Sequence, residues 1–351
     1  MNISKICRLP GRSPSLSVCL RRFRSWLGRF PFATKIYDSV AAIILVVCKK
    51  MKKLVIFTRI VSSKVPCLKP DENRRQYIVS LTSYGSRVKS SAPYAIYSLF
   101  RQDVLPDKII LWLDNKNWSN NNIPFLLRKL KRFGLEIRFC EDVKSFTKLL
   151  FTLEAFPNDS IITADDDLYY PNNWLGKLLF EHKKNPNKII CHRVHGIKVD
   201  ENHNPLPYHL WDYEIDPNIY FSHIFMSQEK SIPRHQLESI FPTGAGGILY
   251  PPKCFHKDVA KKELFLKLSP KQDDIWFWAM AVINTEYFNG ESPYIVIKNG
   301  YAKYLQQVDQ QQRHGNVLWG FNWFQGGNDK QLKAVIGEYP QIKDILSKIQ
   351  P

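Results

Sequence analysis

Short apolar segments that alternate with helical segments are the feature that most constrains the fold of this 351-residue chain. The first two apolar segments, 77–82 (YIVSLT) and 108–113 (KIILWL), are rich in residues that favour strands. Strands buried on both faces and separated by helices are typical of a parallel sheet with helices on both sides. The predicted strands are 77–82, 108–113, 135–140, 160–163 and 188–192, and the predicted helices are 93–101, 123–133, 144–156, 174–184 and 275–281. We therefore expect an α/β protein with a mostly parallel sheet.

The charge of the chain is concentrated at its N-terminus. Residues 1–75 contain 17 Lys and Arg against 3 Asp and Glu, so they carry +14 of the total formal charge of +18. Residues 76–351 are nearly neutral, which argues against nucleic acid as a partner, because such a protein would carry its basic surface on the folded body. We predict a basic extension over 1–75 and a folded domain over 76–351. Seven scattered cysteines favour a reducing compartment over a disulfide framework.

The basic extension contains one continuous apolar run, 40–47, which is shorter than the roughly 20 residues needed to span a bilayer. Wound as a helix, Ile44, Val47, Met51 and Leu54 follow one side, while the lysines of 49–53 fall mostly on the other. A basic amphipathic helix suits an anionic membrane surface. A disordered basic leader is the alternative. We expect a membrane-surface arm.

Three consecutive carboxylates, Asp165, Asp166 and Asp167, follow the predicted strand 160–163. They are expected at the carboxyl edge of the sheet, where open α/β proteins bind ligands. Like charges this close repel unless a cation or a set of donors compensates them. A divalent cation that carries a diphosphate is one compensator. The alternative is a solvated acidic turn that caps the helix beginning near Asn172.

Six motifs in a fixed order carry a resemblance to a known family. They are VSLTSYGSRV (79–88), PDKIILWL (106–113), GLEIRFCEDV (134–143), ITADDDLYYP (162–171), FPTGAGGILYPP (241–252) and QDDIWFWAM (272–280). Together they resemble bacterial family 2-like glycosyltransferases with the GT-A nucleotide-sugar fold, found in capsule, exopolysaccharide and lipopolysaccharide synthesis. The resemblance covers about 77–339. It implies a donor half over about 76–192 and an acceptor half over about 193–351.

The resemblance implies that the acidic triplet holds Mn²⁺ or Mg²⁺ on the donor diphosphate. Residues i and i+2 of an extended chain point the same way, so Asp165 and Asp167 are expected to share the metal while Asp166 faces the ribose. The acidic motif begins one residue earlier in many relatives, where this chain has Ala164. Which two aspartates bind therefore stays open. His314 stands where some GT-A enzymes supply a third metal ligand.

The resemblance also implies a catalytic role for Asp273 and Asp274, which precede the aromatic helix 275–281. An acceptor hydroxyl is a poor nucleophile, so a carboxylate must take its proton as it attacks the sugar. Adjacent carboxylates can raise one pKa, which suits a base. We assign the base to Asp274. The alternative is that both residues only stabilise the N-terminus of the helix.

The remaining predicted contacts belong to the substrates. The resemblance places 82–87 against the nucleotide, Asp114 at its base, and the glycine-rich segment 244–247 beside the donor sugar and acceptor. The candidate substrate-binding residues are Thr82, Ser83, Tyr84, Arg87, Asp114, Asp166, Gly246 and Gly247. A surface arginine, an Asx turn at Asp114 and a tight glycine turn entering a strand are the structural alternatives.

The predicted function is metal-dependent transfer of a hexose from a nucleotide sugar, most simply a UDP-sugar, to a glycan or lipid-linked acceptor. Inverting chemistry is favoured over retaining chemistry because a candidate base is present and a separate nucleophile is not apparent. The expected location is the inner face of a bacterial cytoplasmic membrane. The alternatives are a metal-dependent nucleotidyl or phosphoryl transferase, which would normally show a glycine-rich phosphate loop, and a non-catalytic GT-A-like scaffold at the membrane surface.

Overall fold

The computed structural model describes residues 31–70, 75–212, 239–297, 305–309 and 326–350. The α-helices are α2 (Pro31–Val61), α3 (Arg87–Ser90), α4 (Ala92–Leu99), α5 (Phe125–Lys131), α6 (Thr147–Ala155), α7 (Trp174–Lys184), α10 (Lys262–Leu268), α11 (Asp273–Val282), α13 (Gly327–Glu338) and α14 (Ile342–Leu346). The strands are β1 (Tyr77–Thr82), β2 (Lys108–Asp114), β3 (Leu135–Cys140), β4 (Ser160–Thr163), β5 (Leu168–Tyr169), β6 (Ile189–Cys191), β7 (Val194–Gly196), β8 (Ile240–Pro242), β9 (Ile248–Tyr250), β10 (Tyr294–Val296) and β11 (Gln306–Gln307).

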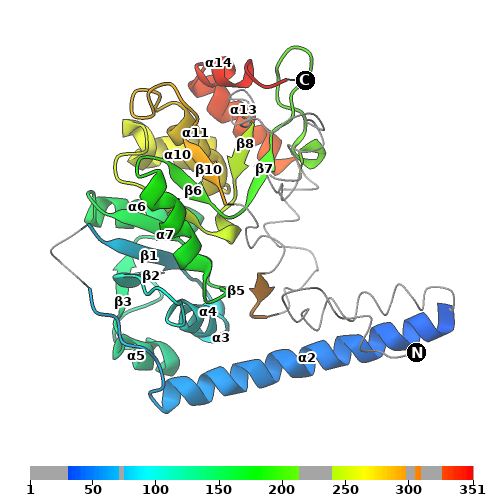
Figure 1. Ribbon diagram of the computed structural model, residues 1–351, viewed down its shortest axis with the longest axis vertical. Helices are drawn as coiled ribbons and strands as arrows, with labels where there is room; N and C mark the ends of the chain where they lie inside the picture. The colour runs from blue at the N-terminus through cyan, green and yellow to red at the C-terminus, as the bar shows by residue number, and fades with distance from the viewer. Residues whose placement is uncertain (1–30, 71–74, 213–238, 298–304, 310–325, 351) are drawn as a thin grey trace. The chain divides into compact units, whose positions relative to one another are not determined.

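The central sheet has seven strands in the order β10-β6-β9-β4-β1-β2-β3 (Figure 1). β1 pairs in parallel with β2 and β4, β2 with β3, and β6 with β10. Only β9 runs antiparallel, and it joins β4 to β6. The predicted α/β class with a mostly parallel sheet is confirmed. The ends of β1 and β4 meet at one edge, since Ser80 is in register with Thr163.

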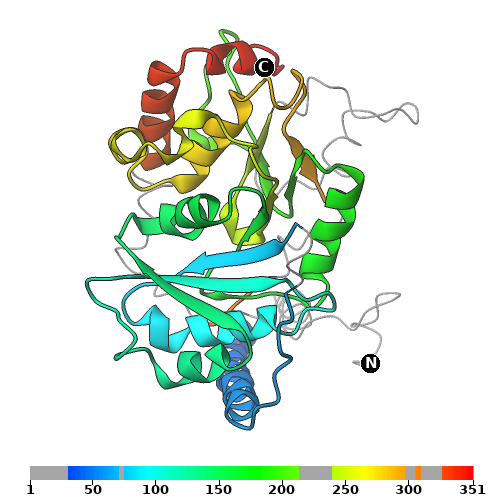
Figure 2. The same ribbon diagram turned by 90° about the vertical axis from the view of Figure 1, so that its left-hand side faces the viewer.

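Helices cover both sides of this sheet (Figure 2). α6 packs against β1 and β4, whereas α7 packs against β6 and β9. The predicted segments agree closely with the elements, and the strands 77–82, 135–140 and 160–163 and the helix 174–184 have the predicted bounds. The predicted helix 144–156 divides into a 3₁₀ turn, Lys144–Phe146, and α6.

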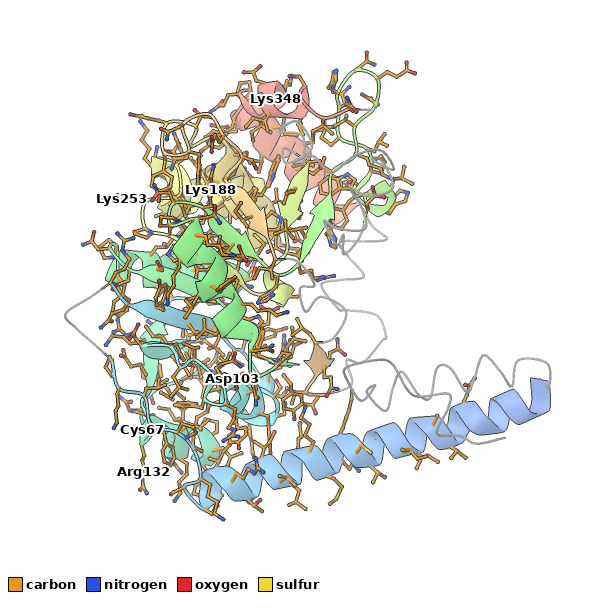
Figure 3. The ribbon with its side chains drawn as sticks, viewed as in Figure 1. Cys67, Asp103, Arg132, Lys188, Lys253 and Lys348 are labelled. Atoms are coloured by element: carbon orange, nitrogen blue, oxygen red, sulfur yellow. The ribbon has the colours of Figure 1, made fainter. Side chains whose placement is uncertain are left out.

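The C-terminal part of the chain contributes an aromatic core. Trp276 and Trp278 on α11 are fully buried and pack in this core. α13 and α14 pack against the same helix. Lys188, labelled in Figure 3, lies 3.0 Å from Glu291 and donates to the carbonyl of Ser292 over 2.7 Å, which ties β6 to the segment before β10.

The chain divides into two units between Arg59 and Ile60, earlier than the predicted boundary at 75/76. In the second unit, Leu68 is buried and its N–H donates to the carbonyl of Phe133 over 2.9 Å. Gly134 follows, with a positive φ of 106° and the Leu68 side chain beside it. In the first unit, α2 is a single helix that extends well beyond the apolar run 40–47. None of the helices in the described ranges has the length and apolar character of a membrane span.

Candidate active site

The three aspartates after β4 form ion pairs with positively charged side chains. Arg87 opens α3 directly after the β1 loop, and its Nη2 lies 2.7 Å from Asp166 Oδ1 and 2.5 Å from Asp167 Oδ2. Ser83 Oγ donates to Asp166 Oδ2 over 2.5 Å. Burial raises the pKa of Asp166 to about 6, although Arg87 and Ser83 act in the opposite direction. Ser83 and Arg87 therefore contact the triplet, as the sequence placed them near it. The carboxylates of Asp166 and Asp167 both face the same nitrogen of Arg87.

Asp165 faces a different cation. Its Oδ1 lies 3.0 Å from Nζ of Lys148 on α6, and its N–H donates to Tyr170 Oη over 2.7 Å. Burial alone would raise the pKa of Asp165, but the ion pair with Lys148 holds that pKa below its ordinary value. The two carboxylates that share one cation are thus Asp166 and Asp167, and Asp165 faces Lys148; the predicted metal pair Asp165 and Asp167 stays a prediction.

The acidic pair on α11 lies beside the same lysine. Asp273 Oδ2 is 3.3 Å from Lys148 Nζ, and Asp274 Oδ1 accepts a hydrogen bond from the Gly244 N–H over 3.0 Å. Burial, followed by the charge of Asp273, raises the pKa of Asp274 to about 7. Both residues occupy the first turn of α11, where Gln272 is the N-cap and makes no side-chain capping bond. A carboxylate with this pKa can accept a proton near neutral pH.

Lys148 also lies at this site, although no sequence motif indicated it. It is buried and joins Asp165, after β4, to Asp273, at the start of α11. Burial alone would lower its pKa, but the surrounding carboxylates raise the pKa well above its ordinary value, so the side chain is charged. The available signal was a lysine within the apolar sequence FTKLLFTL, where a helix facing the sheet is expected to bury its side chains.

The other predicted nucleotide contacts have structural roles of their own. Thr82 Oγ1 donates to the carbonyl of Trp112 over 3.1 Å. Asp114 Oδ1 accepts hydrogen bonds from both the N–H and the side chain of Asn117, three residues on, at 2.8 Å, so this carboxylate has a local partner within its own loop. Tyr84 is 66% exposed, and the Arg87 guanidinium lies 5.4 Å from its ring centre. Tyr84 is therefore an exposed aromatic residue that contacts the arginine paired with the acidic triplet.

The glycine-rich segment forms a 3₁₀ turn, Gly244–Gly246, that leads into β9. Gly247 has a φ of 92°, and a Cβ atom there would clash with the indole of Trp174. A Cβ atom on Gly246 would clash with Arg193. Trp174 Nε1 also donates to the carbonyl of Gly246 over 2.8 Å. Close packing thus requires glycine at these two positions, and their predicted contact with the substrates stays a prediction.

The predicted ligand His314 lies outside the described residues, as do the aromatic residues of 319–324. Within the described ranges, no group of three or more Asp, Glu, His or Cys side chains is arranged as a metal cage. The carboxylates of the triplet are instead divided between Arg87 and Lys148.

The comparison with protein families identifies the domain that contains this site. Residues 81–247 match the family described as glycosyl transferase family 2. The chain contains a family 2 glycosyltransferase domain. The match covers β1, the acidic triplet and the glycine-rich segment, and it confirms the predicted glycosyltransferase family. Asp273, Asp274 and α11 lie C-terminal to the matched range.

Several solved structures are similar to this chain. A mannosyltransferase from Pyrobaculum calidifontis in complex with GDP-Man and Mn²⁺ is 12% identical over 88% of this chain and 79% of its own, with a TM-score of 0.39. Glucosyl-3-phosphoglycerate synthase from Mycobacterium tuberculosis, in complex with Mn²⁺, UDP and glucosyl-3-phosphoglycerate, is 11% identical over 76% and 80%, with a TM-score of 0.41. TarS from S. aureus is 11% identical over 64% and 35%, with a TM-score of 0.38.

At these identities and TM-scores the likeness carries no information about the substrate of this chain. No curated protein matches the sequence.

Proposed function

We propose that this chain transfers a hexose from a nucleotide-sugar donor to an acceptor hydroxyl by a single inverting displacement. The observation that supports it most directly is the buried Asp274, which is held by Gly244 and has a pKa raised by burial to about 7. Asp274 lies next to Asp273, which Lys148 connects to the aspartates after β4. A base and a candidate diphosphate site thus belong to one connected group of residues.

In the proposed step, Asp274 Oδ2 takes the proton of the acceptor hydroxyl, because Oδ1 is engaged by Gly244. The acceptor oxygen forms a bond to the anomeric carbon, and the bond from that carbon to the diphosphate oxygen breaks. The nucleoside diphosphate leaves with the bonding electrons. One displacement inverts the configuration at the anomeric carbon.

We propose that a divalent cation accompanies the donor. Asp166 Oδ1 and Asp167 Oδ2 both lie within 2.7 Å of one Arg87 nitrogen, so their oxygens converge on a single cation position. Carboxylate oxygens are suitable ligands for Mg²⁺ and Mn²⁺. When bound, the cation would neutralise charge on the departing diphosphate. Arg87 must shift to admit it, and its guanidinium is suited to bind a phosphate.

Donor hydrolysis in the presence of Mn²⁺ tests this proposal, with UDP-sugars and GDP-sugars as probes. Release of the nucleoside diphosphate and free sugar supports glycosyl transfer. Release of the nucleoside monophosphate and a sugar phosphate would indicate a nucleotidyl or phosphoryl transferase instead. A metal-independent result, or donor binding without turnover, would contradict the proposed reaction.

We further propose that α2 lies on an anionic membrane, where a lipid-linked or glycan acceptor of a bacterial surface polysaccharide is available at the cytoplasmic face. At 100° per residue most of its exposed apolar side chains share one side of the helix, and Phe57 lies outside that stripe. The residues of the stripe are Val40, Ile43, Ile44, Val47, Met51, Leu54, Val55 and Val61. At the same spacing Lys49, Lys52 and Lys53 fall on the other side of the helix, whereas Lys50 falls at the edge of the apolar stripe. This division is the one that interfacial helices use on negatively charged lipids.

A further inference from the structure

Lys148 has no chemical role in the proposed reaction, although it lies at the centre of the site. Its Nζ lies 3.0 Å from Asp165 Oδ1 and 3.3 Å from Asp273 Oδ2, and its side chain is only 10% exposed. Asp165 belongs to the predicted donor half and Asp273 to the predicted acceptor half. One buried ammonium group therefore holds a carboxylate from each half.

The loop that holds Asp274 is fitted to this ammonium group. A Cβ atom on Gly244 would lie 2.9 Å from Lys148 Nζ and 3.2 Å from Asp274 Oδ1. Gly244 does not have a positive φ, so its backbone would tolerate a side chain. A side chain at Gly244 would therefore take the space of the ammonium group and crowd Asp274 Oδ1, without straining the backbone.

We propose that Lys148 is a positioning residue that fixes the acidic pair of α11 relative to the donor-binding aspartates. The inference rests on the proposed function, because the position matters only if Asp274 acts on an acceptor near the donor. Lys148 holds Asp273 through an ion pair, and Asp273 is bonded in sequence to Asp274. Gly244 holds Asp274 from the other side. The ion pairs of Lys148 are with Asp165 and Asp273, and its charge acts on the Asp274 carboxylate from further away, where it lowers the pKa of Asp274.

Stabilisation of the fold alone does not account well for a buried lysine that is paired with two carboxylates. Buried ion pairs pay a large desolvation cost, and apolar residues of similar volume often stabilise a protein equally well. Positioning, in contrast, has a large effect on rate, since a misplacement of about 1 Å can lower turnover by about 10²-fold.

The first test replaces the charge by an apolar side chain of similar length, Lys148→Met. We expect kcat to fall by about 10²-fold while the KM for the donor changes by less than about threefold, because Arg87, Asp166 and Asp167 keep their places. Lys144→Met is the matched control, since Lys144 is exposed and contacts only the carbonyl of Pro270 among the hydrogen bonds described for its side chain. An unchanged kcat, or a loss confined to the donor KM, would overturn the proposal.

A second variant keeps the charge, which guards against a folding defect in Lys148→Met. Gly244→Ala must displace the ammonium group, and we expect a fall in kcat of the same kind as in Lys148→Met. In the Lys148→Met background, Gly244→Ala should cause a smaller loss than in the wild-type protein, because its Cβ atom then crowds only Asp274 Oδ1. Fully independent losses in the double variant would overturn the proposal.

Thermal unfolding separates failure of this inference from failure of the proposed function. The losses in Tm caused by Lys148→Met and by Asp273→Asn should be less than additive in the double variant, whatever the chain catalyses. If the wild-type protein transfers no sugar while this coupling is present, the proposed function fails and the connection between the halves stands. Additive losses would show that the connection itself does not exist.

Discussion

The N–H of Gly244 donates to Oδ1 of Asp274 over 3.0 Å, and this bond joins the glycine-rich turn to the proposed base. Gly244 lies at the end of the family match, whereas Asp274 lies beyond it. The bond holds one carboxylate oxygen and so orients the other. Burial, which raises the pKa of Asp274 to about 7, makes that second oxygen a better proton acceptor than an ordinary aspartate.

We expect Asp274→Asn to lower kcat by about 10²- to 10⁴-fold, the usual range for general-base catalysis. The asparagine oxygen can still accept the Gly244 bond, so donor affinity should barely change. Steady-state kinetics with the donor identified by hydrolysis measure both quantities. Asp273→Asn is the neighbouring comparison, and Asp274→Asn with normal turnover would remove Asp274 from the mechanism.

The pH dependence follows from the same carboxylate. The base works when deprotonated, so kcat should rise with pH through about 7 and level off above it. The folded state binds this proton more tightly than an unfolded aspartate with a pKa of about 3.9. The contribution of Asp274 to stability is therefore present below about pH 4 and is lost as pH rises through 7. Asp274→Asn should raise Tm at pH 8, and a lower Tm there would contradict this picture.

Removal of the carboxylate of Asp166 or Asp167 should remove the stabilisation of the protein by Mn²⁺ and the donor. We expect Asp166→Asn or Asp167→Asn to abolish the increase in stability that Mn²⁺ and the donor together give to the wild-type protein, which at a hundredfold excess over Kd is about 2.7 kcal/mol. Thermal shift with Mn²⁺, the donor and both together measures the effect. Asp200→Asn is the control, because Asp200 accepts its hydrogen bonds within an exposed turn. An undiminished shift in both site variants would exclude the metal assignment.

Gly247 should be required for folding rather than for binding. Its φ of 92° is costly for any other residue, and a Cβ atom would clash with Trp174. We expect Gly247→Ala to lower the free energy of unfolding by more than about 2 kcal/mol, measured by urea denaturation. Gly337→Ala in α13 is the control, because no atom lies within 4 Å of a Cβ atom there, and it should stabilise by up to about 1 kcal/mol. A neutral Gly247→Ala would contradict the packing argument.

Binding to membranes should depend on the N-terminal arm, residues 1–59. Deletion of residues 1–59 removes a formal charge of +12 and keeps Leu68, which packs beside Gly134 in the body. We expect the truncated protein to keep its turnover of a water-soluble acceptor but to lose sedimentation with anionic vesicles. Vesicle binding of the full chain should weaken as salt rises.

A paired substitution separates the apolar stripe from the charge. Val47→Ser with Leu54→Ser keeps every charge and should still reduce vesicle binding, because it removes buried apolar area. Loss of a concentration-dependent dimer instead, with vesicle binding unchanged, would assign the stripe to a second copy of the chain. Equal vesicle binding by the full and truncated proteins would exclude the arm.

The sequence patterns predicted the helices and strands well, because each helix or strand is determined mainly by residues close to it in the chain. The strand 160–163 and the helix 174–184 follow directly from β-forming and helical runs. The place of β9 between β4 and β6 did not follow, since three apolar residues after a glycine turn do not indicate which strand they join.

The structure connects residues that the sequence patterns indicated only separately. The acidic triplet and the pair on α11 were identified as two separate groups. Lys148, which joins them, is an ordinary helical residue in the sequence and acquires its role only when α6 lies beside α11's first turn. The compensation of the triplet by Arg87 is also a tertiary contact, between loops that follow two different strands.

The antiparallel strand β9 affects how the chain folds during synthesis and whether its two halves can be separated. During synthesis, β4 and β6 leave the ribosome before β9, and neither can complete its pairing until Tyr250 has emerged. A fragment that ends at His192 would expose the backbone of β4 as an open strand edge, which favours aggregation. The two predicted halves are thus not exchangeable modules, and grafting a foreign acceptor half onto this protein would have to bring its own β9.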